Sequence, residues 1–143
     1  MLAMMIAAAA LASSAGPPPV GAWSTGDTDS LVRISACGDA VCGYPLIPPL
    51  PPGVSEHLDV HNPDPALRGR PMHEIQILGL KPATRGVWLG WIYSPRNGRM
   101  YKARLKMLGH ARLKLTGCLV GPLCESQTWT RADDAANPGG APG

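Results

Sequence analysis

Phenylalanine is absent from the 143 residues, and aromatic residues make up only 5% of them. A hydrophobic core must therefore be built from tryptophan, leucine, isoleucine, valine and methionine. Long segments with the hydrophobic period of a helix are also absent, which argues against a helical bundle. The length suits one domain, and an apolar content of 45% is that of a globular protein.

Charge is scarce as well, since the net charge is only +3. The basic residues alternate with apolar ones instead of forming a run, and we therefore expect no nucleic-acid binding. No charged side chain occurs before Asp27, and residues 1–15 read MLAMMIAAAALASSA. This apolar run is too short to span a bilayer and ends in small residues, which is typical of a cleavable export signal. We predict cleavage after Ala15 and a mature protein in the periplasm or outside the cell.

A buried N-terminal helix is the alternative interpretation of the same run. The helix would be apolar on every side, and Gly16 with the prolines at 17–19 would end it at once. No later segment resembles a membrane span. We therefore expect a mature chain without a transmembrane segment.

The sequence has four cysteines, Cys37, Cys42, Cys118 and Cys124, an even number that is typical of disulfides in a small exported domain. Four cysteines allow three pairings. If each close pair flanks a hairpin turn, its two residues face each other across the strands, within disulfide distance. We predict the bonds Cys37–Cys42 and Cys118–Cys124. Neither pair has the spacing of a redox or zinc site.

Most of the remaining chain alternates between apolar and polar residues at the period of a β-strand. In residues 100–107, Tyr101, Ala103, Leu105 and Met107 share one face, and lysine or arginine occupies the other. An Asn-Gly step within residues 94–98 predicts a hairpin loop. Further strands are expected at residues 31–37, 42–47, 75–78, 87–93, 113–116 and 126–131. Because closure removes the edges of a sheet, we predict an all-β fold, a small antiparallel up-and-down barrel.

The chain also contains 16 prolines and 17 glycines, which indicates several irregular segments. Residues 48–52, Pro-Pro-Leu-Pro-Pro, cannot form a central strand, because proline donates no ladder hydrogen bond. We interpret them as a loop at one end of the barrel; a proline-rich ligand for a partner is the alternative. The small and polar tail at residues 132–143 is expected to be disordered, which leaves residues 16–131 as the single domain.

Residues 59–71 combine turn-forming Asn-Pro and Asp-Pro steps with two arginines. Asp64 is expected to cap a short helical turn that begins at Pro65. Arg68 and Arg70 have two interpretations. They can bond loop carbonyls or pair with Asp59 and Asp64, or they can present forked donors to an anionic ligand together with Asn62 and Asp64.

The ordered motifs resemble a family of exported bacterial proteins, the domain of unknown function 2147. The matching pieces are G-A-W at 21–23, D-S-L-V-R-I at 29–34, C-G-D-A-V-C-G at 37–43, N-P-D-P-A-L-R-G-R-P at 62–71, I-L-G-L-K-P at 77–82, G-W-I-Y-S-P-R-N-G-R-M-Y at 90–101 and S-Q-T-W-T-R at 126–131. The resemblance implies export and a fold, but it brings no catalytic residues, because the family has no established activity. The chain departs from the family in its uncharged leader and in residues 44–47, where Pro45 interrupts an aliphatic strand.

A looser resemblance is to the lipocalin-like barrels, which often begin with a Gly-x-Trp motif and stack a late arginine on that tryptophan. Gly21-Ala22-Trp23 and Arg131 match this pattern. A guanidinium over an indole would stabilise the fold by about 0.5–2 kcal/mol and join the two ends of the chain. The resemblance therefore implies a lipocalin-like barrel in which Trp23 and Arg131 have structural roles.

Such a barrel is expected to hold one small ligand or to be filled by its own side chains. Candidate lining residues are Trp88, Trp91, Tyr93, Tyr101, Leu105 and Met107, with a packed core as the alternative. A metal site at His57, Asp59, His61 and His73 is the less favoured alternative, because histidines of this kind usually lie at the surface. No catalytic motif is present, so we expect no enzymatic activity, no cofactor and no metal.

We therefore expect a non-enzymatic binding module for a small hydrophobic or anionic ligand. The alternative is an envelope protein that acts structurally or binds partners, as yet unidentified, through its surface loops.

Overall fold

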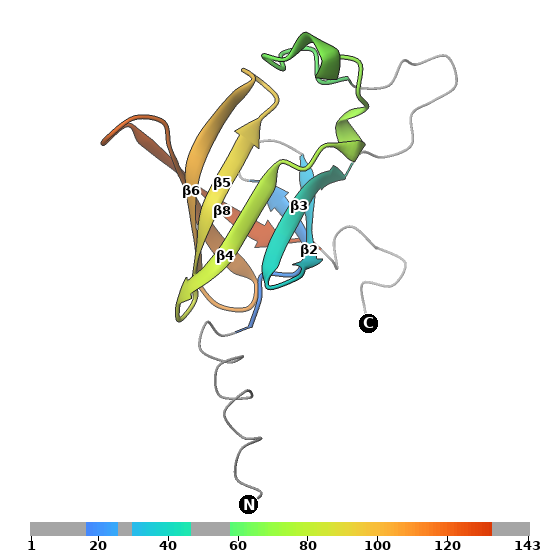
Figure 1. Cartoon of the computed structure of the whole chain (residues 1–143). Coiled ribbons are helices and arrows are strands. Elements are labelled where there is room, and N and C mark those ends of the chain that lie inside the picture. Colours follow the sequence, from blue (N-terminus) through green and yellow to red (C-terminus); the bar gives the residue numbers. More distant parts are fainter. Residues whose placement is uncertain (1–16, 26–29, 47–57, 133–143) are drawn as a thin grey trace, which may run out of the picture.

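The fold is described by a computed structural model that defines residues 17–25, 30–46 and 58–132 (Figure 1). The described strands are β1 (Gly21–Thr25), β2 (Leu31–Cys37), β3 (Ala40–Leu46), β4 (Leu78–Thr84), β5 (Val87–Ser94), β6 (Arg99–Met107), β7 (Arg112–Cys118) and β8 (Cys124–Arg131). Each strand pairs antiparallel with the next, and β8 pairs with β1, so the sheet is a closed barrel. The predicted all-β up-and-down barrel is confirmed.

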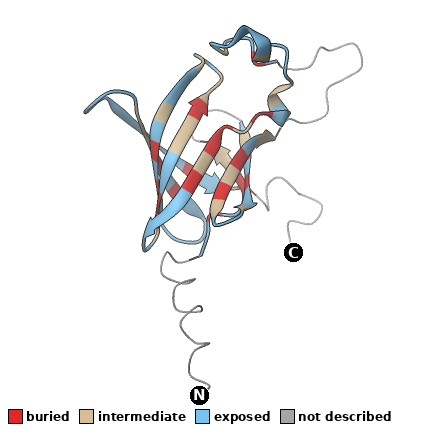
Figure 2. Ribbon diagram, in the orientation of Figure 1, coloured by how far each residue is buried: buried red, intermediate tan, exposed pale blue. Residues whose placement is uncertain are grey.

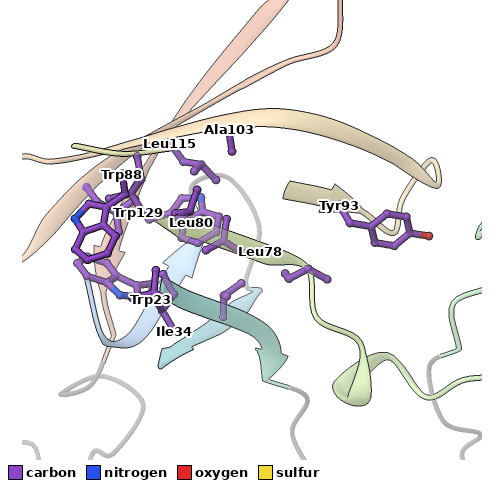
Figure 3. Close-up of a cluster of buried hydrophobic side chains, with 14 of the residues drawn as sticks. Trp23, Ile34, Leu78, Leu80, Trp88, Tyr93, Ala103, Leu115 and Trp129 are labelled. Carbon is purple, nitrogen blue, oxygen red and sulfur yellow. The ribbon is translucent and has the colours of Figure 1, made fainter. Parts of the chain in front are cut away.

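Strand alternation decides which residues fill the barrel. On β6, Ala103 and Leu105 are buried while Arg104 and Lys106 are exposed, as the sequence pattern predicted. Cross-strand partners lie on the same face of a sheet, and Leu105 is opposite both Trp88 of β5 and Leu115 of β7. The inward residues gather into one core with a cluster of three tryptophans, Trp23, Trp88 and Trp129 (Figure 3).

The long connection between β3 and β4 contains two short 3-10 helices, η2 (Pro65–Leu67) and η3 (Met72–Glu74). The Asp64 carboxylate accepts a hydrogen bond from the Ala66 N–H and so caps η2. This confirms the helical turn that the Asp-Pro step predicted. Within the described ranges, no helix is long and apolar enough to cross a membrane.

The fourth strand differs from its prediction. We expected it at residues 75–78, but β4 begins at Leu78 and continues to Thr84, while Ile75 and Ile77 are buried in an irregular segment. The strand passes through Pro82 with a register shift between Pro82 and Thr84, which accommodates the missing N–H. Alternating apolar residues thus marked burial correctly. Ile77 hydrogen-bonds the backbone of Gly43 and Tyr93, but residues 75 and 76 precede the ladder.

Pro45 does not interrupt β3, which continues to Leu46. Residues Val41–Gly43 of β3 pair with β4, whereas Pro45 has its described partner, Val32, on β2 alone. A proline is tolerated where a strand has one neighbour, because it has no ladder hydrogen bond to donate on the other side.

Both predicted disulfides are present, at Cys37–Cys42 and Cys118–Cys124, with Cα–Cα distances of 6.0 and 4.0 Å. The geometric expectation holds for the second bond, since Cys118 is opposite Cys124. It is wrong for the first, because Cys42 is opposite Ser35 and Cys37 is opposite Ala40. The Cys37–Cys42 bond therefore runs diagonally across the hairpin, since the turn is tighter than we expected.

The two ends of the barrel differ. One end carries the β2–β3, β4–β5 and β6–β7 turns together with the first and last residues of the barrel, and we call it the closed end. Trp23 lies there, fully buried, with its Nε1 donating to the Pro19 carbonyl at 3.0 Å. The other end carries the β1–β2, β3–β4, β5–β6 and β7–β8 connections, and we call it the open end.

Arg131 closes the sheet over Trp23. Its guanidinium carbon lies 4.3 Å from the centroid of the indole ring, and the two residues are cross-strand partners between β1 and β8. The same guanidinium donates to the Val20 carbonyl at 2.7 Å and to the His110 carbonyl at 2.9 Å. The stacking that the lipocalin resemblance implied for Trp23 and Arg131 is confirmed.

Several predictions fall outside the described residues: the export signal at 1–15 with its cleavage site, the proline segment at 48–52, and His57. The tail prediction began at Ala132, which is buried and donates its N–H to the Ala22 carbonyl. The domain therefore includes Ala132, because this residue extends the pairing at the closed end. Residues 133–143 of the tail lie outside the described ranges.

Replacing Arg131 by alanine should lower the free energy of unfolding by about 1–3 kcal/mol, because the variant loses the indole contact and two hydrogen bonds to carbonyls. Chemical denaturation followed by tryptophan fluorescence measures this change. The matched control is Arg85→Ala in the exposed β4–β5 turn, which should change stability by less than about 0.5 kcal/mol. Equal effects of the two substitutions would contradict a closing role for Arg131.

Candidate functional site at the open end of the barrel

The inward face of the barrel changes character from one end to the other. Toward the closed end inward side chains such as Leu105 and Leu113 are buried, whereas toward the open end several inward positions, mostly on β5 to β8, are accessible to solvent; Val32 on β2 and Leu78 on β4 remain buried there. We call the accessible set the mouth; it consists of Thr25, Ile92, Arg99, Tyr101, Gly117, Glu125 and Gln127. Each of these residues either lies opposite an inward-facing residue of the next strand or is separated from one by an even number of residues along its own strand. Both relations place its side chain on the inward face.

Pairing between β1 and β8 is described only toward the closed end. β8 begins at Cys124, but in the described part of the chain it pairs with β1 only from Trp129 to Arg131. The first half of β8 therefore has a neighbour on β7 and none on β1 among the described residues. Glu125 and Gln127 lie on this half, and both side chains are exposed.

The mouth combines apolar and polar groups. Ile92 and Tyr101 are opposite each other on β5 and β6, and Gly117 lies beside them on β7. The Tyr101 hydroxyl accepts a hydrogen bond from Asn97 Nδ2 at 2.9 Å, which holds the ring beside the β5–β6 loop. Gln127 Oε1 accepts a hydrogen bond from Trp129 Nε1 at 3.0 Å, which links the polar rim to the tryptophan cluster. An apolar wall with a polar rim suits a small amphiphilic molecule.

The segment at residues 58–77 covers the side of the open end next to β5. Its central feature is Asp59, whose side chain is fully buried. The Tyr93 hydroxyl donates to Asp59 Oδ1 at 2.8 Å, and Asn62 Nδ2 donates to Asp59 Oδ2 at 2.7 Å. Both carboxylate oxygens are therefore satisfied, as burial of a charged group requires. Figure 3 shows Tyr93 apart from the tryptophan cluster, with its hydroxyl pointing away from that cluster.

Tyr93 is the titratable group that this environment changes most clearly. Burial raises the pKa of Tyr93 to about 12, and the hydrogen bond to Asp59 and the negative charge of Asp59 add to the increase. The phenol is therefore held neutral as a donor. It fastens the segment to the barrel instead of serving as a base.

The same segment is anchored at a second point, on the β5–β6 hairpin. Gly98, at a φ of 72°, packs directly against the His61 carbonyl, and any side chain at this position would collide with it. The glycine is thus required twice, by its backbone conformation and by the close approach. The segment is therefore held at Tyr93 on β5 and at Gly98 in the β5–β6 loop.

The polar residues that we expected to bind ligand mostly hold this segment together. Asn62 uses its amide nitrogen on Asp59 and its amide oxygen on the Asp64 N–H, at 2.8 Å. Arg68 Nε donates to the Asn62 carbonyl at 2.7 Å, and an Arg70 terminal nitrogen donates to the Glu74 carbonyl at 3.4 Å. These bonds are the loop-fastening role that was one of two interpretations. Ligand binding by Asn62, Asp64, Arg68 and Arg70 stays a prediction.

The aromatic candidates separate into three positions. Trp88 is buried in the core, and its Nε1 has no hydrogen-bond partner among the described residues. Tyr101 is partly exposed in the mouth, as a lining residue should be. Trp91 faces outward instead, because it is opposite Lys102 and its indole covers Gly79, where a Cβ would lie 2.7 Å from Nε1. The prediction that Trp91 lines the interior was therefore wrong, because strand alternation places its side chain on the outer face.

Trp91 lines a depression of about 270 Å³ on the outer wall over β3 to β5, together with Gln76, Lys81 and Leu89. Of the remaining lining candidates, Leu105 is fully buried in the core and Met107 packs at its edge. Tyr93 faces outward like Trp91, since it is opposite Met100, and bonds Asp59 of the covering segment. The packed-core alternative therefore describes the closed half of the barrel. The mouth is confined to the open half.

A metal site was the less favoured alternative at Asp59, His61 and His73. Among the described residues, no three histidine, cysteine or acidic side chains lie close enough together to hold a metal ion. Asp59 is instead committed to Tyr93 and Asn62, and His73 lies 3.7 Å from the Glu74 carboxylate.

Of the seven mouth residues, only Tyr101 was predicted from the sequence, and the six that were missed include the polar residues Arg99, Glu125 and Gln127. The signal was available, because the alternation through Ala103 and Tyr101 reaches Arg99 at the next inward position. Counting back from Trp129 reaches Gln127 and Glu125 in the same way. Polar residues at inward positions looked like the outer face of a strand, since accessibility of the interior is not visible in a sequence.

Comparison with known proteins gives a family and a fold. The sequence matches a family described as "Uncharacterized protein conserved in bacteria (DUF2147)" over residues 21–131. A solved structure described as "Protein HP1028 from the human pathogen Helicobacter pylori belongs to the lipocalin family" is similar, with a TM-score of 0.72 and 20% identity. The match covers 85% of this chain and 88% of that one. No curated protein matches the sequence significantly.

The Asp59–Tyr93 bond yields a pH-dependent prediction. Tyr93→Phe should lower the free energy of unfolding by about 1–3 kcal/mol near neutral pH, because Asp59 loses a buried donor. Since the pKa of Tyr93 is raised to about 12 by folding, its contribution is complete below about pH 10 and is lost as the pH rises toward 12. The difference between the wild type and Tyr93→Phe should therefore narrow over that interval.

Urea denaturation at a series of pH values measures this narrowing. The matched control is Tyr44→Phe, which removes the hydroxyl of an exposed tyrosine on β3 and should have little effect at any pH. A difference between the wild type and Tyr93→Phe that stays constant from pH 8 to 12 would refute the assigned role of burial and Asp59.

Proposed function

The chain belongs to the DUF2147 family of bacterial proteins, and from the geometry of its barrel we propose that it is a non-enzymatic binding module for a small ligand. The observation that supports the proposal is the change along the inward face, which is packed at the closed end and accessible at the mouth. The lipocalin-like fold agrees with it, since barrels of this size hold one small ligand. The ligand enters at the open end and stops at the tryptophan cluster.

The chemistry of the mouth narrows the class of ligand. Ile92 and Tyr101 offer an apolar surface, whereas Arg99 and Gln127 offer donors at the rim. A small molecule with an apolar body and a polar or anionic head group fits this arrangement. Glu125 gives the β8 side of the rim a negative charge, so an anionic head group belongs on the β6 side beside Arg99.

Catalysis is not part of the proposal. Among the described residues, the one titratable group with a strongly changed pKa is Tyr93, and its shift is explained by burial and by its bond to Asp59. The Tyr93 hydroxyl donates its hydrogen bond to Asp59 of the covering segment, and we therefore assign it no contact with a substrate.

The alternative function is an envelope module that acts structurally or binds protein partners through its surface loops. Arg68 and Arg70 are the feature that supports it, because both are exposed and each commits one nitrogen to a loop carbonyl. The remaining guanidinium nitrogens have no described partner and could reach a carboxylate of another protein.

Filling the mouth tests the binding proposal. A Cβ on Gly117 would lie 3.5 Å from Tyr101 Cβ and 3.7 Å from Ile92 Cγ2, so Gly117→Leu places a larger side chain in the mouth without a backbone collision. The uncharged fluorescent probe N-phenylnaphthylamine should bind the wild type. Its affinity should fall at least about tenfold in Gly117→Leu, a loss of about 1.4 kcal/mol.

The matched control is Gly69→Leu, which adds the same side chain where a Cβ would have no heavy atom within 4 Å. Probe binding should be unchanged there, and both variants should keep the thermal midpoint of the wild type. Equal binding by the wild type and Gly117→Leu would exclude the mouth and favour the loop-based alternative.

We also propose that the protein works in an oxidising compartment, the periplasm or the cell exterior. The two disulfides support this, since such bonds persist where thiols are oxidised. Native protein isolated from the periplasm without reductant should show no free thiol in a titration, and reduced, unfolded protein should show four. Reactive thiols in the native periplasmic protein would contradict the proposal.

A further inference from the structure

The charges of the chain are distributed unevenly. Between Glu74 and Glu125 the sequence contains no acidic residue at all, although it contains nine of the 13 lysines and arginines. These nine are Lys81, Arg85, Arg96, Arg99, Lys102, Arg104, Lys106, Arg112 and Lys114. The segment covers strands β4 to β7, so one side of the barrel is free of carboxylates within that stretch of sequence.

Strand alternation gathers five of these cations on one surface. We call this surface the basic wall; it consists of the outward residues of β6 and β7, Lys102, Arg104, Lys106, Arg112 and Lys114. Lys106 is directly opposite Lys114, a like-charge pair that is unfavourable in an isolated sheet. No carboxylate among the described residues lies within ion-pair distance of any of the five. The wall also contains a depression of about 200 Å³, lined by Arg104, Lys106, Leu108, Lys114 and Thr116.

The β7–β8 turn carries a second unusual feature, which we call the apolar tip: Leu119, Val120 and Leu123. Val120 and Leu123 are each 67% exposed, although both are large hydrophobic residues. The tip is held in shape by backbone bonds from Leu119 N to the Leu123 carbonyl and from Leu123 N to the Val120 carbonyl, both 3.0 Å. The Cys118–Cys124 disulfide joins the two strands at its base.

The apolar tip projects from the barrel at the end of the β7–β8 hairpin (Figure 1), and its surface is exposed (Figure 2). It is continuous with the basic wall, because Lys102 of β6 is opposite Cys118 at the base of the tip. A projecting apolar group beside an unpaired basic surface is the combination that a peripheral protein uses at an anionic bilayer.

We propose that this face of the protein docks on a membrane that contains anionic lipid. The apolar tip enters the boundary between head groups and acyl chains, and the basic wall lies against the lipid phosphates. Contact with phosphates relieves the repulsion between Lys106 and Lys114, which no described protein group does. A nucleic acid would satisfy the charges but would leave Val120 and Leu123 in water. The wall residues themselves include no aromatic side chain, and Trp91, which lies opposite Lys102 on the outer face, packs its indole over Gly79.

The proposal is independent of ligand binding in the mouth. Gly117 and Tyr101 face inward, whereas the basic wall faces outward from the same strands. Substitutions in the wall should therefore leave N-phenylnaphthylamine binding unchanged, and Gly117→Leu should leave membrane binding unchanged. Failure of the membrane-docking proposal would therefore leave the ligand-binding proposal intact, and the reverse also holds.

Co-sedimentation with vesicles tests the docking. The full chain should bind vesicles of phosphatidylglycerol mixed with phosphatidylcholine, and its affinity should fall as salt is raised. Vesicles of phosphatidylcholine alone should bind at least about tenfold more weakly, because they offer no net negative charge. Every variant carries the same residues 1–15, so comparison between lipids and between variants removes any contribution from that apolar run.

Two double variants separate the two parts of the surface. Lys106→Gln with Lys114→Gln should reduce binding to anionic vesicles about tenfold, because two phosphate contacts are lost. Val120→Ser with Leu123→Ser should also reduce it, and should abolish the binding that remains at high salt. The charge-matched control, Lys81→Gln with Arg85→Gln, removes two exposed cations outside the wall and should change affinity less than about twofold.

Several results would overturn the proposal: equal binding to anionic and neutral vesicles, an equal loss in the charge-matched control, or no loss in the Lys106/Lys114 variant. Binding to a DNA oligonucleotide without binding to anionic vesicles would replace the membrane by a nucleic acid. Full retention of binding by the Val120/Leu123 variant would overturn insertion of the tip. Circular dichroism of each variant confirms that the fold is kept, and the glutamine substitutions relieve the Lys106–Lys114 repulsion instead of adding strain.

Discussion

Pairing of the first strand with the last is the constraint on which the rest of this structure depends. β1 meets β8 over only three described residue pairs, from Trp23–Arg131 to Thr25–Trp129. Such a short seam would be weak on its own, but the guanidinium of Arg131 binds it from both sides, over the indole ring and onto two carbonyls. The seam between the described residues lies toward the closed end, which is the end where Trp23 and Trp129 are packed.

The sequence was a good guide where one physical rule was enough. Alternation in residues 100–107 predicted both faces of β6, and the Asn-Gly step predicted the loop that precedes it. The two disulfides and the stacking of Arg131 on Trp23 were also predicted. Each of these predictions depends on local spacing or on a resemblance, and none of them requires knowledge of how distant segments pack together.

The sequence was a poor guide where two distant segments decide the outcome. Trp91 looked like an interior residue because it lies in a continuous apolar run, but Gly79 of the neighbouring strand gives its indole a place on the outer wall. Ile75 and Ile77 looked like part of a strand because they alternate, yet both are buried before β4 begins at Leu78. Likewise, basic residues that are spread along two strands form one surface only because the register brings Lys106 opposite Lys114.

Asp59 shows how the irregular segment is made specific. A buried carboxylate is costly unless it is bonded, so the segment at 58–77 has one favourable position, where Tyr93 and Asn62 both reach it. Substitution of Tyr93 or Asn62 would leave the buried Asp59 carboxylate with one hydrogen-bond donor fewer. The candidate residues Asn62 and Arg68 thus contribute to the open end by fixing the shape of its border.

The described barrel starts and finishes at its closed end, where Val20 accepts from Arg131 and Ala132 donates to Ala22. Anything joined to the polypeptide beyond either of these points departs from the side opposite the mouth. A fluorescent protein or an affinity handle attached at the carboxyl terminus is therefore compatible with an unobstructed entrance. Immobilisation through such a handle would orient every copy with its entrance toward the surrounding solution.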